Sequence, residues 1–308
     1  MKIVFFGTPD FAVPSLDALI RSRHQVVLVV AQPDRPAGRG MRMRRPPVAQ
    51  LAIEAGIPLL QPSRIRTEEF LAEVRAARPD LGVVVAYGRI LPPPLLEIPA
   101  HGFLNVHGSL LPKYRGAAPI QRCIEAGEPV TGVTIMRVDE ELDHGPMLGA
   151  AEIPIGPLER TPSVAARLAG IGAALLVSVI DAVEDGVAVE TPQDHSRATH
   201  AAKISREEGR VDWIASPMTL LNRDRAFDPW PGSSIAIGDE TVKLHGLEAA
   251  SGSDAAPGTI LRVEADGIVV ACGGGAIRVR ELQRAGRKPL PASEVARHLG
   301  LHEGGSLL

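Results

Sequence analysis

The first half of the chain alternates largely apolar short runs with segments whose apolar residues recur at helical spacing. Lys2–Phe6, Gln25–Ala31 and Leu81–Ala86 are typical of strands that are buried on both faces of a parallel sheet. Pro14–Arg21 and Thr161–Gly186 carry helical patterns, with a proline in the first turn of one and a glycine at the end of the other. This alternation predicts the α/β fold class, with a doubly wound parallel sheet of Rossmann-like form.

The pattern changes in the last third of the chain. Residues 189–205 are polar and irregular, which predicts a linker between a first domain at residues 1–188 and a second domain at residues 206–308. Short apolar runs separated by turns follow, at Ser234–Ile237, Val242–Leu244, Gly258–Leu261, Ile268–Ala271 and Ala276–Val279. Short strands at such close spacing predict a small β-barrel.

Composition narrows the class of protein. The 308 residues are 45% hydrophobic and 22% charged, as in an ordinary soluble globular protein. No apolar run approaches the roughly 18 residues of a membrane span, and the opening residues fit a first strand better than a secretory leader. Cys123 and Cys272 share no metal-ligand spacing, and Cys123 fits a helix core better than a nucleophile. We therefore expect a cytoplasmic location, no membrane contact, no disulfide and no metal.

Three polar residues are candidates for chemistry. Asn105 and His107 are two apart at the end of the predicted strand Phe103–Val106, so both side chains point to the same face. The strand Gly132–Val138 runs into an acidic loop that contains Asp143. Because the ends of parallel strands share one edge of a sheet, and ligands bind there in open α/β folds, we expect Asp143 to meet His107 in space.

An amide, an imidazole and a carboxylate support a limited set of reactions. Asn105 and a protonated His107 can donate hydrogen bonds to a developing oxyanion, and Asp143 can keep the imidazole charged or move a proton. No Ser or Cys in this stretch is flanked by a base, which argues against a covalent acyl-enzyme. The alternatives are a core histidine and a turn-forming asparagine. His144, directly after Asp143, either competes with His107 for the carboxylate or is a harmless exposed side chain.

The strand–helix–strand opening also invites a dinucleotide-binding interpretation, with Asp34 in place of the acid that binds ribose. However, Thr8, Pro9 and Asp10 follow Gly7 at the point where a second glycine should let a pyrophosphate approach. An acid at that position repels phosphate. The spacing therefore argues against a nicotinamide cofactor.

Residues 32–47 form a local basic anomaly in a chain of net charge −3. This Pro- and Gly-rich loop has one acid, Asp34, and five arginines, Arg35, Arg39, Arg42, Arg44 and Arg45. One interpretation is a solvated, mobile loop. The other is a phosphate-binding arm, because arginine makes forked contacts with phosphate oxygens.

Several motifs together resemble the folate-dependent formyltransferases. They are H-G-S-L-L-P at His107–Pro112, Y-R-G-A-A-P at Tyr114–Pro119, G-T-P-D-F at Gly7–Phe11, Q-P-D-R-P-A-G-R-G at Gln32–Gly40 and P-W-P at Pro229–Pro231. The resemblance covers nearly the whole chain and is closest to the branch that acts on initiator methionyl-tRNA. It implies transfer of a formyl group from the co-substrate 10-formyltetrahydrofolate to the α-amino group of the methionine on that tRNA. It also implies an oligonucleotide-binding-like (OB-like) form for the second domain, and we expect a monomer.

The resemblance assigns roles to residues at matching positions. Asn105, His107 and Asp143 match the catalytic residues. The arginine-rich loop matches an arm that inserts at the acceptor end of tRNA, with Arg39 the main candidate for contact. The folate pocket would be lined, largely through backbone groups, by Tyr87, Gly88, Arg89, Ile90, Leu91, Ser109, Leu110, Leu111 and Pro112.

Two observations qualify this picture. From residue 206 to the end the chain has 12 Lys/Arg and 14 Asp/Glu, a net of −2, so tRNA contact in the second domain needs a local patch. The candidates are Arg278, Arg280, Arg284, Arg287 and Lys288. The run from Leu221 to Asp224, like His144, departs from the family pattern. One rival function is formyl transfer to a small amine, and the arginine arm argues against it. The other is a non-catalytic RNA-binding role, and the catalytic trio argues against that.

Overall fold

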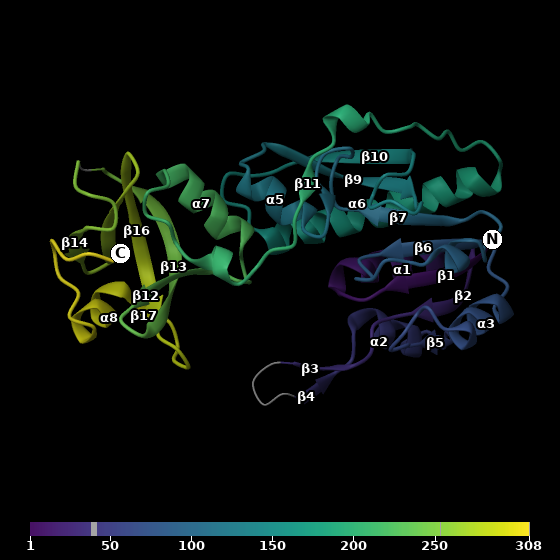
Figure 1. Ribbon diagram of the computed structural model, residues 1–308, viewed down its shortest axis with the longest axis horizontal. Coiled ribbons are helices and arrows are strands. Elements are labelled where there is room, and N and C mark those ends of the chain that lie inside the picture. Colours follow the sequence, from purple (N-terminus) through teal and green to yellow (C-terminus); the bar gives the residue numbers. More distant parts are fainter. Residues whose placement is uncertain (38–41, 253, 308) are drawn as a thin grey trace. The chain divides into compact units, whose positions relative to one another are not determined.

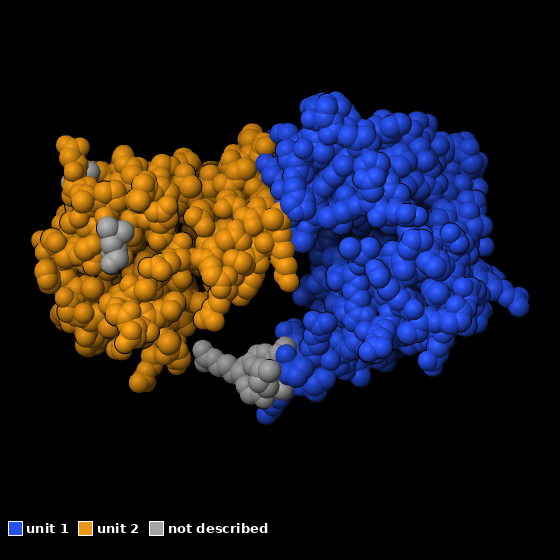
Figure 2. Space-filling model, viewed as in Figure 1, with its two compact units in different colours: residues 1–119, 130–154, 163–201 blue, residues 120–129, 155–162, 202–308 orange. Residues whose placement is uncertain are grey.

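The computed structural model describes residues 1–37, 42–252 and 254–307. The chain forms two compact units (Figure 2). Unit 1 consists of residues 1–119, 130–154 and 163–201, and unit 2 consists of residues 120–129, 155–162 and 202–308. The domain boundaries predicted from the sequence, at residues 188 and 206, stay a prediction, because this division into units follows contacts and not the order of the chain.

A seven-stranded sheet is the centre of unit 1 (Figure 1). Its strand order is β10-β9-β7-β6-β1-β2-β5. The strands are β1 (Lys2–Gly7), β2 (Gln25–Val30), β5 (Leu59–Leu60), β6 (Leu81–Val85), β7 (Phe103–His107), β9 (Val130–Arg137) and β10 (Met147–Pro154). The five strands from β7 to β5 pair in parallel, which confirms the predicted α/β fold class.

We expected Asp143 to meet His107 because the two strands before them would end at the same edge of the sheet. The direction of β9 shows that this reason is wrong. β9 pairs antiparallel with β7, with Leu104 opposite Arg137 and His107 opposite Thr134. β9 therefore ends beside the start of β7, and the two strands do not leave the sheet at the same edge. The acidic loop after β9 instead turns back toward the middle of β7.

Helices of unit 1 follow the strands as the sequence pattern predicts. They are α1 (Val13–Arg21), α2 (Pro47–Glu54), α3 (Glu68–Ala76), α4 (Pro93–Leu96) and α6 (Thr161–Glu184), whose first two residues belong to unit 2. The side chain of Thr67 accepts a hydrogen bond from the backbone N–H of Phe70 and so caps α3. In the core, the ring of Phe6 makes edge contacts with Tyr87 and Phe103, at centroid distances of 5.3 and 5.6 Å.

Helix α6 has the length and apolar composition of a membrane span. Val164, Leu168, Leu176 and Ile180, which recur along one side of the helix, are fully buried in unit 1. A core helix of a globular protein shows the same pattern, because a helix that packs on a sheet buries one apolar stripe.

Unit 2 contains an antiparallel sheet with the order β12-β13-β16-β15-β14, and β17 pairs with β16. The strands are β12 (Ser233–Ile237), β13 (Glu240–Ala250), β14 (Ile260–Glu264), β15 (Gly267–Cys272), β16 (Gly275–Gln283) and β17 (Leu290–Pro291). Helices α5 (Pro119–Glu125, from Ile120 on), α7 (Pro217–Ala226) and α8 (Ala292–His298) complete the unit. The short apolar runs of the last third of the chain therefore form strands, as predicted. A closed OB-like barrel stays a prediction.

Two short elements attach residues 191–201 to the rest of unit 1. Thr191 and Met147 exchange backbone hydrogen bonds of 2.8 Å. The strand β11 (His200–Ala201) pairs in parallel with β8 (Arg115–Gly116). This part of the predicted linker therefore lies along the region that follows the His107 motif.

Candidate functional site

Asp143 is the point at which the candidate residues meet. Its Oδ1 accepts a hydrogen bond from Nδ2 of Asn105 at 3.2 Å, and its Oδ2 accepts one from the backbone N–H of Gly116 at 2.8 Å. Nδ1 of His107 lies 3.6 Å from the same Oδ2. The structure thus brings together all three residues that the sequence singled out, within unit 1.

The imidazole of His107 is fixed on both sides. Its Nε2 lies 2.9 Å from the backbone carbonyl of Tyr114, and a carbonyl only accepts, so Nε2 carries a hydrogen and donates. Nδ1 then faces the carboxylate of Asp143. His107 is only 5% exposed, so this contact is largely shielded from water.

Unusual backbone geometry produces this arrangement. Tyr114 and Asp143 both have left-handed φ angles, of +60° and +50°, which few residues with side chains adopt. At Tyr114 the backbone turns after the S-L-L-P motif, and the Tyr114 carbonyl reaches His107. At Asp143 the acidic loop turns so that the carboxylate reaches β7. Strain of this kind gathers at functional sites, where the surrounding structure holds it in place.

The loop after His107 is braced by buried hydroxyl groups. Thr134 donates from Oγ1 to the carbonyl of Ser109 at 2.7 Å and accepts from the N–H of Leu111 at 3.2 Å. Ser109, which is fully buried, donates from Oγ to the carbonyl of Lys113 at 2.7 Å. Leu110 packs over Gly132 of β9, where a Cβ would clash with it. Of the predicted folate-pocket residues in this loop, Ser109 and Leu111 are therefore buried parts of the loop itself, while Pro112 is half-buried.

The second predicted folate segment follows β6. The ring of Tyr87 is buried in the core, and burial raises the pKa of its hydroxyl group. Its backbone carbonyl accepts from Thr8 Oγ1 and Gln32 Nε2, both at 3.2 Å. Leu91 also belongs to the core. A contact of Tyr87 with a ligand would therefore have to come from its backbone.

The remaining residues of that segment lie nearer the surface. Gly88 is exposed with a φ of +84°, and the side chain of Ile90 is 69% exposed. Arg89 donates from Nη1 to the carbonyls of Pro62 and Ser63, at 3.2 and 3.0 Å. Gly88 and Ile90 thus present backbone and apolar surface, as a flat heterocycle would require.

The arginine-rich segment is a hairpin where the sequence predicted a loop. The strands β3 (Arg35–Ala37) and β4 (Arg42–Arg44) pair antiparallel, with Arg35 opposite Arg44, and lie away from the main sheet (Figure 1). Arg42, Arg44 and Arg45 are exposed, and none of them forms an ion pair with any residue that the structure describes. Arg39 lies outside the described residues.

The basic candidates of unit 2 differ from this hairpin, because most of them are paired with acids. Arg278 contacts Glu264 and Asp266, and Arg280 contacts Glu248 at 2.7 Å and Asp266 at 2.6 Å. Arg284 contacts Glu240 at 2.8 Å. The positive charge of these three arginines is therefore offset by the acids Glu264, Asp266, Glu248 and Glu240. Arg287 and Lys288 are exposed in the turn before β17.

Neither departure from the family pattern disturbs the site. His144 pairs through Nδ1 with Asp139 at 2.9 Å, and so does not compete with His107 for Asp143. In unit 2, the buried Asp224 accepts from Arg160 at 2.7 Å and from Ser233 at 2.8 Å. The unusual run that ends at Asp224 is therefore part of an internal polar network.

Sequence reasoning missed Gln193, which lies in the segment predicted as a linker. Gln193 is 4% exposed, and its side chain binds the backbone of Asp143 and Gly145. Arg115 donates to it from the other side. A lone glutamine in polar, aperiodic sequence has no pattern that marks it as buried.

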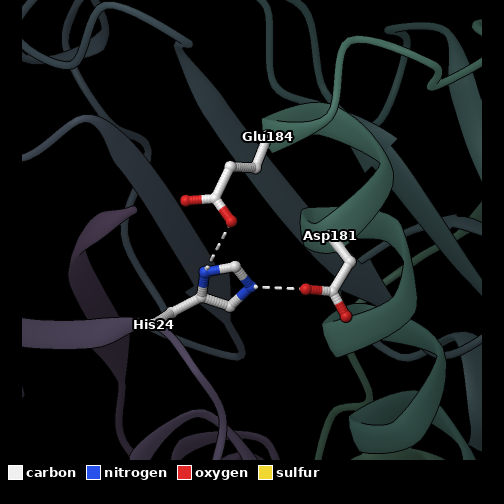
Figure 3. Close-up of side chains that lie close together, drawn as sticks. All are labelled: His24, Asp181 and Glu184. Atoms are coloured by element: carbon white, nitrogen blue, oxygen red, sulfur yellow. Dashed lines mark ion pairs between the residues drawn. The ribbon is translucent and has the colours of Figure 1, made fainter.

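One cluster of ligand-type side chains lies elsewhere in unit 1. His24 faces Asp181 and Glu184 of α6, with their nearest ring and carboxylate atoms 3.2 and 3.8 Å apart (Figure 3). Two cations form ion pairs with these carboxylates. Arg23 contacts both of them, and the α-amino group of Met1 lies 2.6 Å from Glu184. The hydrogen bond from Arg23 lowers the pKa of Asp181. We interpret the cluster as an ion-pair network that ties α6 to the start of β2.

The chain matches known proteins along its length. Residues 1–180 match the family model described as formyl transferase, and residues 203–300 match that of the formyl transferase C-terminal domain. A methionyl-tRNA formyltransferase from Geobacter sulfurreducens is 46% identical over 304 residues, 99% of this chain and 96% of that protein. One from Thermus thermophilus is 47% identical over 304 residues, 99% of this chain and 98% of that protein.

A solved structure with the same fold is that of HypX from Aquifex aeolicus in complex with tetrahydrofolic acid. It has a TM-score of 0.63 at 20% identity, over 97% of this chain and 47% of that chain. At this identity the likeness concerns the fold alone.

With a mostly parallel sheet, a trio of amide, imidazole and carboxylate, and these matches, the chain belongs to the formyl transferase family. It is a folate-dependent, formyl-transferring enzyme. Within the family it belongs with the methionyl-tRNA formyltransferases.

Proposed function

We propose that this chain moves the formyl group of 10-formyltetrahydrofolate to the α-amino group of the methionine on initiator tRNA, with Asn105, His107 and Asp143 as the reacting site. The observation that carries this proposal is that the side chains of Asn105 and His107 both meet the Asp143 carboxylate. The formylated tRNA then serves translation initiation, and we infer that the enzyme works in the cytoplasm as a monomer.

The acceptor amine needs no strong base. A free α-amino group titrates near roughly 7.7–8.0, and the ester bond to tRNA lowers this value, so a neutral nucleophile is available at pH 7. The amine nitrogen attacks the formyl carbon, and negative charge builds on the formyl oxygen. The bond from that carbon to N10 of the folate then breaks, N10 gains a proton, and the amine loses one.

Asn105 and His107 stabilise the oxyanion in this scheme. Nδ2 of Asn105 carries two hydrogens and gives one to Asp143, which leaves the other for the formyl oxygen. On His107, Nε2 stays with the carbonyl of Tyr114, so the working nitrogen is Nδ1. At 3.6 Å from Asp143, Nδ1–H is beyond ordinary hydrogen-bonding distance of the carboxylate, which leaves it available to a substrate oxygen.

Asp143 has two tasks. Its negative charge next to Nδ1 stabilises the positive charge that His107 carries when Nδ1–H donates to the oxyanion. Its carboxylate can also move the proton from the amine to N10, directly or through a water. The N–H of Gly116 holds Oδ2 in place during this step.

We place the folate along Tyr87–Leu91 and Ser109–Pro112, the two segments that follow β6 and β7, with Tyr87 in contact through its backbone. The exposed Ile90 offers an apolar contact and Gly88 an open backbone. For the tRNA, we assign the β3–β4 hairpin, with Arg35, Arg39, Arg42, Arg44 and Arg45, as the phosphate-binding arm. Arg42, Arg44 and Arg45 are exposed and form no ion pair with the described part of the chain, whereas Arg278, Arg280 and Arg284 are paired with acids.

The test is a choice of acceptor. The protein is incubated with 10-formyltetrahydrofolate labelled in the formyl group, together with charged initiator tRNA, a purine-precursor amine or an amino sugar nucleotide. We expect label on the methionyl-tRNA alone. Label on a small amine would assign a different formyl acceptor, and binding of tRNA without any transfer would leave only an RNA-binding role.

A further inference from the structure

Gln193 is a buried amide with all of its hydrogen-bonding capacity in use. Its Nε2 donates to the backbone carbonyls of Asp143 and Gly145, at 2.9 and 2.8 Å. Its Oε1 accepts from Arg115, at 3.0 Å from Nε and 2.6 Å from Nη2. An amide has two N–H donors and two acceptor positions, so these four bonds satisfy it completely.

The two carbonyls belong to the turn that presents the Asp143 carboxylate. Asp143 has a φ of +50°, so its peptide units do not rest in a common conformation by themselves. One amide that binds the carbonyls of residues 143 and 145 holds the backbone on both sides of His144. The turn is thus fixed from its backbone side by Gln193, while Asn105 and Gly116 hold the carboxylate from the other.

Neighbouring contacts keep Gln193 itself in place. Arg115 also reaches Nδ1 of His195, with Nη2 at 2.8 Å. The ring of His195 stacks on that of His144, with centroids 4.1 Å apart and planes nearly parallel. The pairing of Thr191 with Met147 anchors the segment just before Gln193. Segment and turn are therefore joined at several points around this one amide.

We propose that Gln193 is a positioning residue for formyl transfer, and that it aims the Asp143 carboxylate at His107 and the reacting atoms by binding the carbonyls of Asp143 and Gly145. The inference rests on the role proposed above for Asp143. Gln193 itself needs no contact with either substrate.

The substitution Gln193→Glu separates positioning from simple packing. A glutamate has the same shape and still accepts from Arg115, but its carboxylate cannot donate to the two carbonyls and repels them. In the full-length protein we expect kcat to fall by about 100-fold, because a small displacement of a reacting group has effects of this order. The KM values for folate and tRNA should change less than about threefold, since the binding surfaces are untouched.

Glu190→Gln is the matched control. It removes a 2.7 Å ion pair between Glu190 and Arg137 that tethers the same segment, without touching Asp143 or Gly145. We expect its kcat to equal that of the unaltered enzyme. An equal loss of kcat in both variants would overturn the proposal, because a loosened segment would then explain the effect.

A double-mutant cycle with Asp143→Asn gives the decisive comparison. If Gln193 acts through Asp143, then Gln193→Glu lowers kcat in the unaltered enzyme and adds little to Asp143→Asn. Losses that multiply, or an unchanged kcat in Gln193→Glu, would overturn the positioning role. An unchanged kcat in Asp143→Asn alone would instead overturn the proposed function of Asp143. Should Gln193→Glu not fold, Arg115→Lys, which removes the forked support of Oε1, takes its place in the cycle with the same two outcomes.

Discussion

Asp143 accepts a hydrogen bond on each carboxylate oxygen and faces a buried imidazole, and these contacts set the chemistry of the site. An aspartate at this position is an acceptor on both sides, which suits Asn105 and Gly116 as donors. An amide of the same shape would have to present an N–H group to one of these two donors. The requirement for a carboxylate thus follows from geometry as well as from charge.

We predict that Asp143→Asn lowers kcat by roughly 10²- to 10⁴-fold, the range for loss of a positioned proton-transfer group. The KM values should change little, because the carboxylate acts on the reacting atoms and not on the rest of either substrate. Steady-state kinetics with each substrate varied in turn check this. A variant that kept its kcat and lost affinity would place Asp143 in substrate binding.

The three site residues were predictable because their signals are local. Asn105 and His107 share a strand face, and Asp143 follows the next strand in an acidic loop. Gln193 and the carbonyl of Tyr114 could not be predicted, because a backbone carbonyl has no sequence signature and a buried amide in polar sequence looks like any exposed one. The sequence thus predicted that these three side chains meet, but not the groups that hold them in place.

At the scale of elements, the β3–β4 hairpin and the sheet of unit 2 show two opposite uses of arginine. Arg42 and Arg44 of the hairpin are exposed and lack ion pairs with the described residues, whereas Arg280 and Arg284 of unit 2 are bound to carboxylates. A phosphate that approached Arg280 or Arg284 would have to displace the glutamate that is bound to it. A phosphate that approached the hairpin would replace only water and counterions.

We predict that Arg42→Ala and Arg44→Ala, like Arg39→Ala in the same arm, raise KM for tRNA and leave folate binding unchanged. Each should lower the slope of log affinity against log salt by about one unit per phosphate contact removed. Filter binding of tRNA between 50 and 300 mM salt measures this, with Arg284→Ala as the control for an arginine already paired with Glu240. Unchanged slopes in all three arm variants would rule out the arm as a phosphate-binding surface.

His24, between β2 and α6, makes the stability of unit 1 depend on pH. Burial, followed by the nearby α-amino group of Met1, lowers the pKa of His24 below its ordinary value of 6.5, despite two carboxylates nearby. The folded state therefore binds a proton less readily than the unfolded chain, so stability is full above pH 6.5 and falls as the pH drops below it. We predict a smaller loss of Tm between pH 7.5 and 5.5 in His24→Gln than in the unaltered protein.

Thermal unfolding at both pH values, with the exposed His101→Gln as control, measures this difference. The control should keep the pH dependence of the unaltered protein. An equal pH dependence in His24→Gln would show that His24 does not contribute.

Some element-level features could be predicted and others could not. Continuous apolar runs revealed the central strands, because burial on both faces leaves only apolar residues. The antiparallel direction of β9 could not be predicted, since an apolar strand carries no mark of its direction relative to a neighbour. The pairing of Arg35 with Arg44 was hidden by a Pro- and Gly-rich composition typical of loops.

At the scale of the whole molecule, the second unit is not one continuous stretch of chain. Residues 120–129 and 155–162 belong to it together with residues 202–308. Arg122 pairs with Glu208 at 2.6 Å, and Arg160 pairs with the buried Asp224 at 2.7 Å. A composition change near residue 190 shows where the sequence becomes polar, but it cannot show which earlier segments pack with later ones.

We predict that a fragment ending at residue 202 unfolds at a lower temperature than unit 1 does in the full chain. The cut leaves residues 120–129 and 155–162 without the partners of Arg122 and Arg160. Calorimetry of the fragment and of the full chain measures the two transitions. A fragment that melts at the same temperature as the full chain would show that the two segments are stable without the rest of unit 2.

Formyl transfer at this site requires Asn105, His107 and Asp143 to surround one formyl carbon, and a single-turnover rate tests this most directly. Enzyme in excess over labelled 10-formyltetrahydrofolate, with saturating methionyl-tRNA, is compared with the variant Asn105→Ala. Loss of one oxyanion donor should slow transfer by about 10²- to 10³-fold, or about 3 kcal/mol, while both substrates still bind. A single-turnover rate in Asn105→Ala equal to that of the unaltered enzyme would contradict the account.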